Sequence, residues 1–202
     1  KLNSGRMISG HPMPDNKISV TERFNNRIIL WCGNLGIHKR PELFIQLAKD
    51  MASSKCRFIM VGGHADKDYV KQLLAKAPAN IEITGQVTFD EANAYFDNAT
   101  ILVNTSESEG FPNTYIQAWL RGIPTIVFDA DPDQVISNNN LGFQAKSLED
   151  AARFISLILN DFTEYGRYSG NAICYAREHH TIEIRTDNFL KQLGIENPTL
   201  HT

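Results

Sequence analysis

Short apolar runs alternate with amphipathic stretches along most of this chain. Runs of four or five mainly apolar residues predict strands, and their continuous apolarity is typical of a parallel sheet that is covered on both faces. The predicted strands span residues 28–32, 58–61, 81–84, 101–104 and 125–128.

The stretches between these runs carry hydrophobic residues at helical spacing. Phe44, Leu47 and Met51 lie on one stripe after Pro41, a residue type that favours the first turn of a helix. Further helices are expected over 69–74, after Thr88, after Ser147 and over 162–193, and Thr88 and Ser147 each precede an acidic residue at the spacing of a capping box. This alternation predicts a Rossmann-like, doubly wound parallel sheet of the α/β class, with ligands beyond the carboxyl ends of its strands.

Three segments are expected along the chain. Residues 1–26 mix Gly, Pro, Asn and Ser without periodicity, which predicts a linker that enters from a domain outside this chain. Residues 27–178 form the α/β domain. Residues 179–202 form a C-terminal helix and tail.

The composition narrows the class of protein. A chain of 202 residues that is 42% apolar can bury one substantial core. The net charge of -3 and the scattered basic residues argue against nucleic acid as a partner. No apolar run approaches the roughly 20 residues of a membrane helix, and the first residues show no signal pattern, which predicts a soluble, cytoplasmic chain without a transmembrane segment.

The cysteine and histidine residues favour no metal site. Cys32, Cys56 and Cys174 are odd in number and far apart, which favours reduced thiols over a disulfide or a metal site. Adjacent helical histidines such as His179 and His180 point about 100° apart, so a solvated helix end is favoured over a metal site.

A glycine-bearing turn after the first predicted strand is the first candidate for chemistry. Gly33 and Gly36 precede Lys39, and the helix begins directly afterwards at Pro41. Such a turn presents backbone N–H groups and the positive end of a helix to an anion, and the Lys39 ammonium is placed to neutralise a phosphate. Spacing alone, however, favours ordinary turn glycines and a solvated lysine, because neither a P-loop nor a dinucleotide fingerprint is present.

The segment from residue 104 to residue 124 carries a sharper pattern. A strand ends at residue 104, and the following polar loop carries the carboxylates of Glu107 and Glu109. Pro112 then starts a helix whose next N–H groups, those of Asn113 and Thr114, are free to bind an anion. The pattern indicates a binding edge, with Glu107 as a solvated loop charge.

The helix after Pro112 is expected to have two distinct faces. Asn113 and Gln117 share one face by their i, i+4 spacing, and this face is expected to meet a ligand. Ile116, Trp119 and Leu120 share another face, which is expected to pack in the core.

The residues of this segment resemble the signature of a known family. Ser-x-x-Glu-Gly-Phe-Pro-Asn beginning at Ser106, followed by Gln-Ala-Trp and Gly-Ile-Pro-Thr, is similar to the signature of the group 1 retaining glycosyltransferases of GT-B fold. The resemblance covers nearly all of residues 27–177 and implies that residues 27–178 are the donor-binding half of such an enzyme. It implies donor contacts around Gly110, Phe111, Pro112, Asn113 and Thr114.

The family pairs two glutamates with seven residues between them. The first holds the transferred sugar and corresponds to Glu109, and the second holds the nucleotide ribose and corresponds to Gln117, a departure from the two-carboxylate pattern. The resemblance therefore implies a catalytic position for Glu109 and a ribose contact for Gln117.

The family also places an Arg and a Lys toward the donor diphosphate, after the glycine that corresponds to Gly33. These positions are Asn34 and Lys39, so half of the cationic clamp is replaced by a group that donates only a neutral hydrogen bond. His38 and Arg40 are candidates to replace the missing charge.

A further turn precedes Thr88 and borders the expected crevice. The resemblance implies that main-chain atoms near Val87 contact the nucleotide base, whereas the residues themselves are equally consistent with a plain turn. Gly62-Gly63-His64 indicates a second turn at the same crevice.

The resemblance implies transfer of a sugar from a nucleoside diphosphate sugar, of UDP or GDP type, with retention of configuration and without a metal or other cofactor. Lys39 and the helix after Pro112 would stabilise the departing diphosphate, and Glu109 would hold the sugar hydroxyls. A glycan or lipid-linked acceptor, in surface polysaccharide or glycoconjugate synthesis, would bind a missing N-terminal domain, which could also place the protein peripherally at the inner membrane face. This chain alone is then expected to bind rather than catalyse.

Two alternatives remain open on the residues alone. A non-catalytic nucleotide-sugar-binding module of the same fold is consistent with Asn34 and Gln117 at the two departing positions. A sugar-nucleotide 2-epimerase or a phosphorylase would carry a histidine-rich crevice or a pyridoxal-binding lysine motif, and the sequence shows neither.

Overall fold

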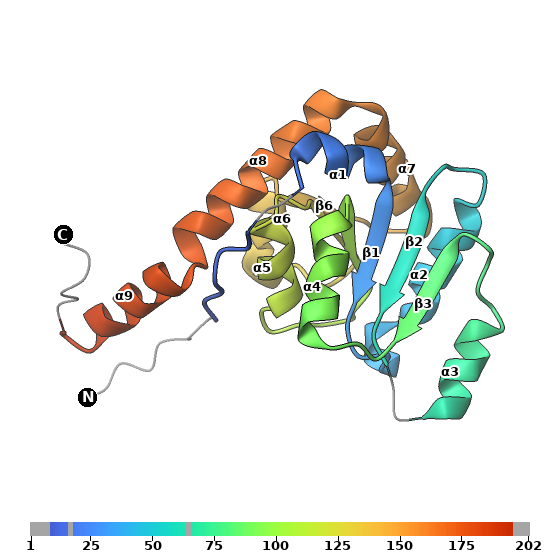
Figure 1. Cartoon of the computed structure of the whole chain (residues 1–202), viewed down its shortest axis with the longest axis horizontal. Coiled ribbons are helices and arrows are strands. Elements are labelled where there is room, and N and C mark those ends of the chain that lie inside the picture. Colours follow the sequence, from blue (N-terminus) through green and yellow to red (C-terminus); the bar gives the residue numbers. More distant parts are fainter. Residues whose placement is uncertain (1–8, 16–17, 64–65, 196–202) are drawn as a thin grey trace.

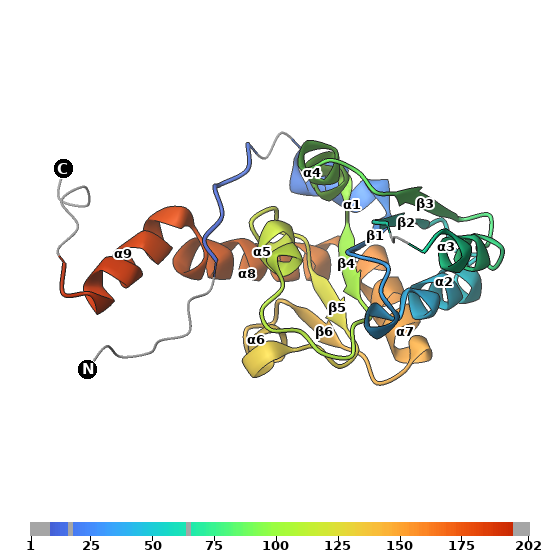
Figure 2. The same cartoon turned by 90° about the horizontal axis from the view of Figure 1, so that it is seen from below.

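The apolar runs assemble into one parallel sheet in the computed structural model, which describes residues 9–15, 18–63 and 66–195. The strands are β1 (Ile28–Cys32), β2 (Arg57–Val61), β3 (Ile81–Gly85), β4 (Ile101–Asn104), β5 (Thr125–Val127) and β6 (Gly142–Gln144). Their order is β3-β2-β1-β4-β5-β6, and all neighbouring pairs are parallel (Figures 1 and 2). The predicted Rossmann-like fold class is confirmed.

Helices cover both faces of this sheet. They are α1 (Val20–Asn26), α2 (Pro41–Asp50), α3 (Lys67–Leu74), α4 (Phe89–Asn98), α5 (Asn113–Trp119), α6 (Val135–Asn138), α7 (Leu148–Asn160), α8 (Phe162–His179) and α9 (Ile182–Gln192), with short 3-10 turns at Ile37–Lys39 and Pro132–Gln134. Buried residues of α2 and α7 pack on one face, and those of α4, α5 and α6 pack on the other.

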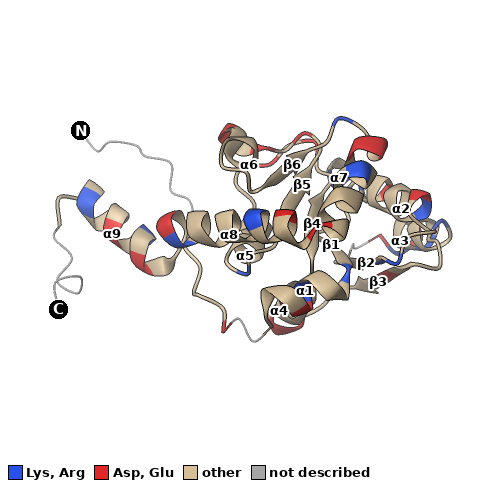
Figure 3. Ribbon diagram, turned by 90° about the horizontal axis from the view of Figure 1, so that it is seen from above, with Lys and Arg blue, Asp and Glu red and all other residues tan. Residues whose placement is uncertain are grey.

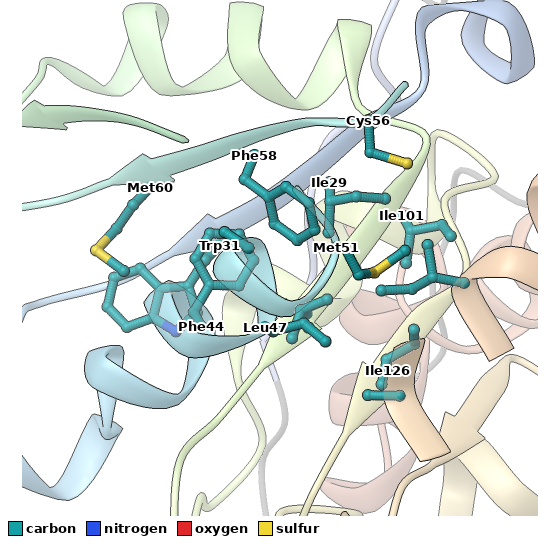
Figure 4. Packing of buried hydrophobic residues seen from close by; sticks show 14 of the residues in the cluster. Ile29, Trp31, Phe44, Leu47, Met51, Cys56, Phe58, Met60, Ile101 and Ile126 are labelled. Carbon is teal, nitrogen blue, oxygen red and sulfur yellow. The ribbon is translucent and has the colours of Figure 1, made fainter. Parts of the chain in front are cut away.

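Each central strand contributes alternate residues to the two cores, as the pleat of a strand requires. Ile29 and Trp31 of β1 belong to the core beneath α2, where Phe44 lies with its ring centroid 5.5 Å from that of Phe58 (Figure 4). Leu30, the residue between them, belongs to the opposite core. Burial on both faces explains why the strand sequences are continuously apolar.

The helix starts follow the capping residues in the sequence. Thr88 and Glu91 form a capping box at the start of α4, as predicted. At α7, the Ser147 hydroxyl accepts from the N–H of Asp150, whereas the Asp150 carboxylate accepts from the N–H of Lys146. The second capping box is therefore only half formed.

The segment that the sequence predicts as a linker contains a helix. Ser19 and Glu22 form a capping box that starts α1, and Phe24 of this helix lies 5.2 Å from Phe162 and 5.3 Å from Tyr165 between ring centroids. The lack of periodicity does not prevent a helix over 20–26, because a capping box starts it and Val20 and Phe24 pack against the core of the domain. The role of residues 1–26 as a linker stays a prediction.

The C-terminal helices lie beside the described N-terminal segment (Figures 1 and 2). α8 packs against α1, α5 and α7, and α9 continues away from the sheet. The N–H of His11 donates to the carbonyl of His180 at 2.9 Å, and the N–H of Ile182 donates to the carbonyl of His11 at 3.2 Å. Residues at opposite ends of the chain are thus joined at the α8–α9 junction.

His180 at that junction is buried, with 1% of its surface exposed. Its ring lies 4.9 Å from Phe111, 5.5 Å from Tyr175 and 6.1 Å from Trp119 between centroids. The prediction of a solvated helix end is wrong for His180, although His179 is exposed. The two adjacent histidines in the sequence do not reveal that Phe111, from a loop distant in the sequence, packs on His180.

Charged residues are spread over several elements, with Lys and Arg interspersed among Asp and Glu along the ribbon (Figure 3). The described part of the chain contains no helix that is long and apolar enough to span a membrane. Its three cysteines are all free thiols.

Candidate donor-binding site

The strand order reverses between β1 and β4, which is the position where open α/β sheets bind their ligands. A cavity of about 220 Å³ lies there, beyond the carboxyl ends of these two strands, and we call it the switch-point cavity. Of the predicted site residues, it is lined by Gly33, Lys39, Glu109, Pro112, Asn113 and Thr114. Residues from two distant parts of the sequence therefore meet at one place.

Lys39 and Glu109 form an ion pair in this cavity. The side chains are 22% and 13% exposed, respectively. The Ser106 hydroxyl donates to the same Glu109 oxygen at 2.6 Å, and the Asn104 amide donates to it at 3.4 Å. The carboxylate is thus held by one cation and two neutral donors.

The environment of Glu109 fixes its protonation state. Burial by itself raises the pKa of this carboxyl, but the hydrogen bonds from Lys39 and Ser106 and the Lys39 charge outweigh burial, so the pKa lies below its usual value. Glu109 is therefore an ionised acceptor at neutral pH, suited to receive hydrogen bonds from hydroxyl groups rather than to donate a proton.

Arg40 and Thr105 hold the loop that carries Glu109. Arg40 Nε donates to the carbonyl of Thr105 at 2.7 Å, and its guanidinium also pairs with Asp129. The Thr105 hydroxyl donates to the carbonyl of Lys39, and Trp31 Nε1 donates to that hydroxyl at 2.9 Å. Arg40, a candidate for the missing cation, is engaged in positioning this loop. The sequence contains no signal for the role of Thr105.

A second cavity, of about 460 Å³, adjoins the first, with which it shares Cys32 and Gly33. It lies at the ends of β1, β2 and β3 and the start of α4, and we call it the glycine cavity. Among the predicted site residues, Gly33, Asn34 and Val87 line it. Burial raises the pKa of Cys32 to about 11, so this thiol is protonated at neutral pH.

Backbone atoms form much of the glycine cavity. Gly62 has φ +148°, and a Cβ at this position would lie 1.7 Å from the carbonyl oxygen of Gly33. The N–H of Gly33 donates to the carbonyl of Val61 at 3.0 Å, and the N–H of Leu35 donates to the carbonyl of Gly63 at 3.1 Å. The turn predicted at Gly62 and Gly63 therefore borders the crevice, and His64 lies outside the described residues.

The structure separates Gln117 from the other predicted site residues. Ile116, Trp119 and Leu120 are buried in the core, as predicted for that face of α5. Gln117 is half-buried and lines a third cavity, of about 100 Å³, together with the segment 11–14. His11 Nε2 of that segment lies 3.3 Å from Asn113 Oδ1. The shared face of Asn113 and Gln117 thus meets the N-terminal segment, which divides it between two cavities.

Two other predicted residues stand outside the lining of these cavities. Gly110 is exposed on the loop, and the Phe111 ring packs against Trp119 at 6.0 Å and against His180. Phe111 anchors the loop to the C-terminal helices. Among the described residues, no group of three or more His, Cys, Asp or Glu side chains could hold a metal ion.

Comparison with known proteins identifies the family. The model of the family "Glycosyl transferases group 1" matches residues 26–161. This chain belongs to that family. The family resemblance inferred from the segment 104–124 is thereby confirmed at the level of group 1.

Curated relatives of the chain include two longer proteins. An uncharacterized glycosyltransferase of Haemophilus influenzae is 24% identical over 159 residues, which cover 74% of this chain and 43% of the relative. An alpha-monoglucosyldiacylglycerol synthase of Acholeplasma laidlawii is 28% identical over 134 residues, which cover 65% of this chain and 33% of the relative. The chain therefore spans less than half the length of either relative.

Solved structures share the fold. HepE of Anabaena, in complex with UDP, aligns with a TM-score of 0.75 at 18% identity over 92% of this chain and 56% of that one. TarM aligns with a TM-score of 0.72 at 20% identity, over 92% and 37%. The C-terminal domain of a group 1 glycosyl transferase from Francisella tularensis aligns with a TM-score of 0.68 at 18% identity, over 82% and 99%. The described fold is that of a Rossmann-like domain of GT-B glycosyltransferases.

Proposed function

We propose that this chain is the donor-binding domain of a retaining, metal-independent glycosyltransferase that uses a nucleoside diphosphate sugar. The observation that carries the proposal is the ion pair of Lys39 and Glu109, held in a cavity at the topological switch point of a group 1 domain. One member of the pair suits a diphosphate and the other suits the hydroxyl groups of a sugar.

Each charged residue has a separate role in this proposal. The Lys39 ammonium stabilises the negative charge that develops on the departing diphosphate. Glu109 accepts hydrogen bonds from the sugar and orients its anomeric carbon. When Lys39 turns to a phosphate, Glu109 keeps its bonds from Ser106 and Asn104, so the carboxylate stays in place.

The nucleoside part of the donor is assigned to the glycine cavity. Its lining carries no charged side chain among the described residues, which suits a neutral base, and Gln86 and the peptide groups near Val87 supply hydrogen-bonding groups. HepE has been solved with UDP, and the pneumococcal O-GlcNAc transferase GtfA with UDP and GlcNAc, which favours a UDP-type donor here.

The whole protein is proposed to contain an N-terminal acceptor domain. The alignment covers 99% of an isolated C-terminal domain, whereas it covers only 43% and 33% of the two curated relatives. The acceptor would be a glycan or a lipid-linked group, as in surface polysaccharide or glycoconjugate synthesis. Such an enzyme would act in the cytoplasm or peripherally at the membrane.

Titration calorimetry and thermal shift with UDP, GDP and uridine test the donor-binding proposal. A nucleoside diphosphate should bind with a Kd in the micromolar to millimolar range, about -4 to -8 kcal/mol. If neither UDP nor GDP gives a response at millimolar concentration, the donor-binding proposal is contradicted.

A non-catalytic nucleotide-sugar-binding module is the second candidate, supported by the separation of Gln117 from the Lys39–Glu109 pair. Transfer assays on the full-length protein distinguish the two functions. Glu109→Gln should abolish sugar transfer while UDP still binds, whereas a wild-type protein that binds a UDP-sugar but neither transfers nor hydrolyses it would favour the second candidate.

A further inference from the structure

Phe89 is an exposed aromatic residue at the border between two cavities. Phe89 is 63% exposed, although it is the first residue of a helix whose other phenylalanine, Phe96, is fully buried. Phe89 lines both the glycine cavity and the third cavity, which contains Gln117. None of the roles assigned above uses this residue.

The backbone at Phe89 is firmly placed. The N–H of Thr88 donates to the Glu91 carboxylate at 2.8 Å, and the N–H of Glu91 donates back to the Thr88 hydroxyl at 3.3 Å. This capping box fixes the first turn of α4 at the same edge of the sheet where β1, β2 and β3 end (Figure 1). An aromatic ring held there loses little conformational entropy when it meets a ligand.

The surroundings of Phe89 suit a flat, uncharged group. The neighbouring wall residues Val61, Val87 and Ala92 are apolar, and Gly62 and Gly63 expose bare peptide groups. Charged groups are gathered instead in the switch-point cavity, where Lys39 and Glu109 lie. A ligand that spans both cavities would therefore place its charged part at Lys39 and its planar part near Phe89.

We propose that Phe89 stacks against the base of the donor nucleotide. The inference rests on the proposed donor-binding function and adds a residue to it. Stacking on an aromatic ring depends on the π face that every base has, so Phe89 contributes affinity for the nucleoside without selecting one base. The same ring also lines the cavity that contains Gln117, so it forms the border between that cavity and the base.

The test compares three ligands on variants of the full chain. Phe89→Ala should weaken UDP and uridine by the same factor, about 5- to 20-fold, the lower part of the range for loss of one stacked base. Pyrophosphate, which has no base, should bind wild type and variant equally. Phe89→Trp should restore UDP binding, because a larger ring preserves the stack. Phe189→Ala, at an exposed position of α9, is the matched control and should change none of these affinities.

Tryptophan fluorescence gives a readout that does not depend on affinity. The native Trp31 and Trp119 are buried, so Phe89→Trp introduces an exposed indole whose emission UDP should quench on stacking. Trp31 lines the switch-point cavity, so the wild-type response to UDP is the baseline, and Phe189→Trp should show no saturable quenching beyond it.

The outcomes separate this inference from the proposed function. If wild type binds UDP and Phe89→Ala binds it equally well, Phe89 is not a stacking residue, although the donor site stands. If Phe89→Ala weakens pyrophosphate as much as UDP, its effect is structural and the stacking assignment fails. If wild type binds neither UDP nor GDP, both proposals fail.

Discussion

At the scale of single residues, the site depends on which partner each charged group keeps. Glu109 has three donors and Lys39 is shared between this carboxylate and any phosphate that enters. Charge-assisted hydrogen bonds are stronger than neutral ones, so the loss of Lys39 should lower the affinity for a nucleoside diphosphate far more than the affinity for the nucleoside.

Lys39→Ala is therefore expected to weaken UDP binding by about 1 to 3 kcal/mol. Uridine should bind wild type and variant equally, and calorimetry measures both. Lys49→Ala, at an exposed position of α2, serves as the control for loss of one positive charge. Equal losses for UDP and uridine would instead assign Lys39 a purely structural role.

The lowered pKa of Glu109 links this residue to stability in acid. A carboxyl whose pKa is depressed on folding stabilises the native state above its usual pKa of 4.5, and the stabilisation is lost as the pH falls below that value. Wild type should thus be more stable than Glu109→Gln at neutral pH, and the difference should shrink in acid. Urea unfolding of both proteins at neutral pH and at about pH 3.5 measures this, and a difference that does not depend on pH would contradict it.

We propose that Gln117 makes a neutral contact with the ribose at the position that corresponds to the second carboxylate of the family. Gln117→Ala is expected to cost about 0.5 to 1.5 kcal/mol of UDP affinity, because one amide hydrogen bond to the ribose is lost. The fold should be unaffected, since the side chain is only half-buried. A 2′,3′-dideoxy nucleotide should bind wild type and variant alike, and unchanged binding of UDP itself would remove the ribose role.

At the scale of elements, the sequence predicts what local rules determine. Five strands follow from continuous apolar runs, and the start of α4 follows from its capping box. β6 is missed because it has three residues and depends on its pairing with β5. α1 carries a Ser19–Glu22 capping box that is visible in the sequence, but its two hydrophobic residues, Val20 and Phe24, are too few to mark a helical stripe, although their i, i+4 spacing puts them on one face.

The capping box of α4 supports both the helix and the proposed stacking residue. Thr88→Ala removes an acceptor from the first turn, so the free energy of unfolding should fall by about 0.5 to 2 kcal/mol. Because the start of α4 borders the glycine cavity, uridine affinity should fall as well. Chemical denaturation and calorimetry test the two effects, with the exposed Thr186→Ala in α9 as the control. A variant with unchanged stability would show that the cap contributes nothing.

At the scale of the whole molecule, the sequence predicts a set of site residues but not how these residues are distributed among the three cavities. Lys39 and Glu109 follow from two separate motifs, yet their ion pair depends on β1 and β4 being neighbours in the sheet. Helical spacing places Asn113 and Gln117 on one face, but it says nothing of the segment 11–14 that divides this face. Long-range packing, which no local pattern encodes, accounts for these differences.

The junction of α8 and α9 connects this packing to the loop that carries Glu109 and Phe111. The His180 ring packs against the Phe111 ring of this loop, and the His180 carbonyl accepts a hydrogen bond from the N–H of His11. The ring Nε2 of His180 is buried and has no hydrogen-bond partner among the described residues. Burial, with the nearby charges of Arg185, His179 and His11, lowers the pKa of His180 to about 3. The folded protein therefore holds this ring in its neutral form.

A pH-dependent loss of stability follows from that neutral ring. The unfolded chain binds a proton at His180 near its usual pKa of 6.5, whereas the folded chain binds it only near 3, so stability falls as the pH falls between these values. His180→Phe fits the aromatic cluster and cannot be protonated, so its stability should decline less than that of wild type over this range. Urea unfolding from neutral pH to about pH 5 measures the two slopes above the range where carboxylates titrate. Parallel slopes would show that His180 titrates alike in both states, and the α8–α9 junction would then open to water without unfolding the domain.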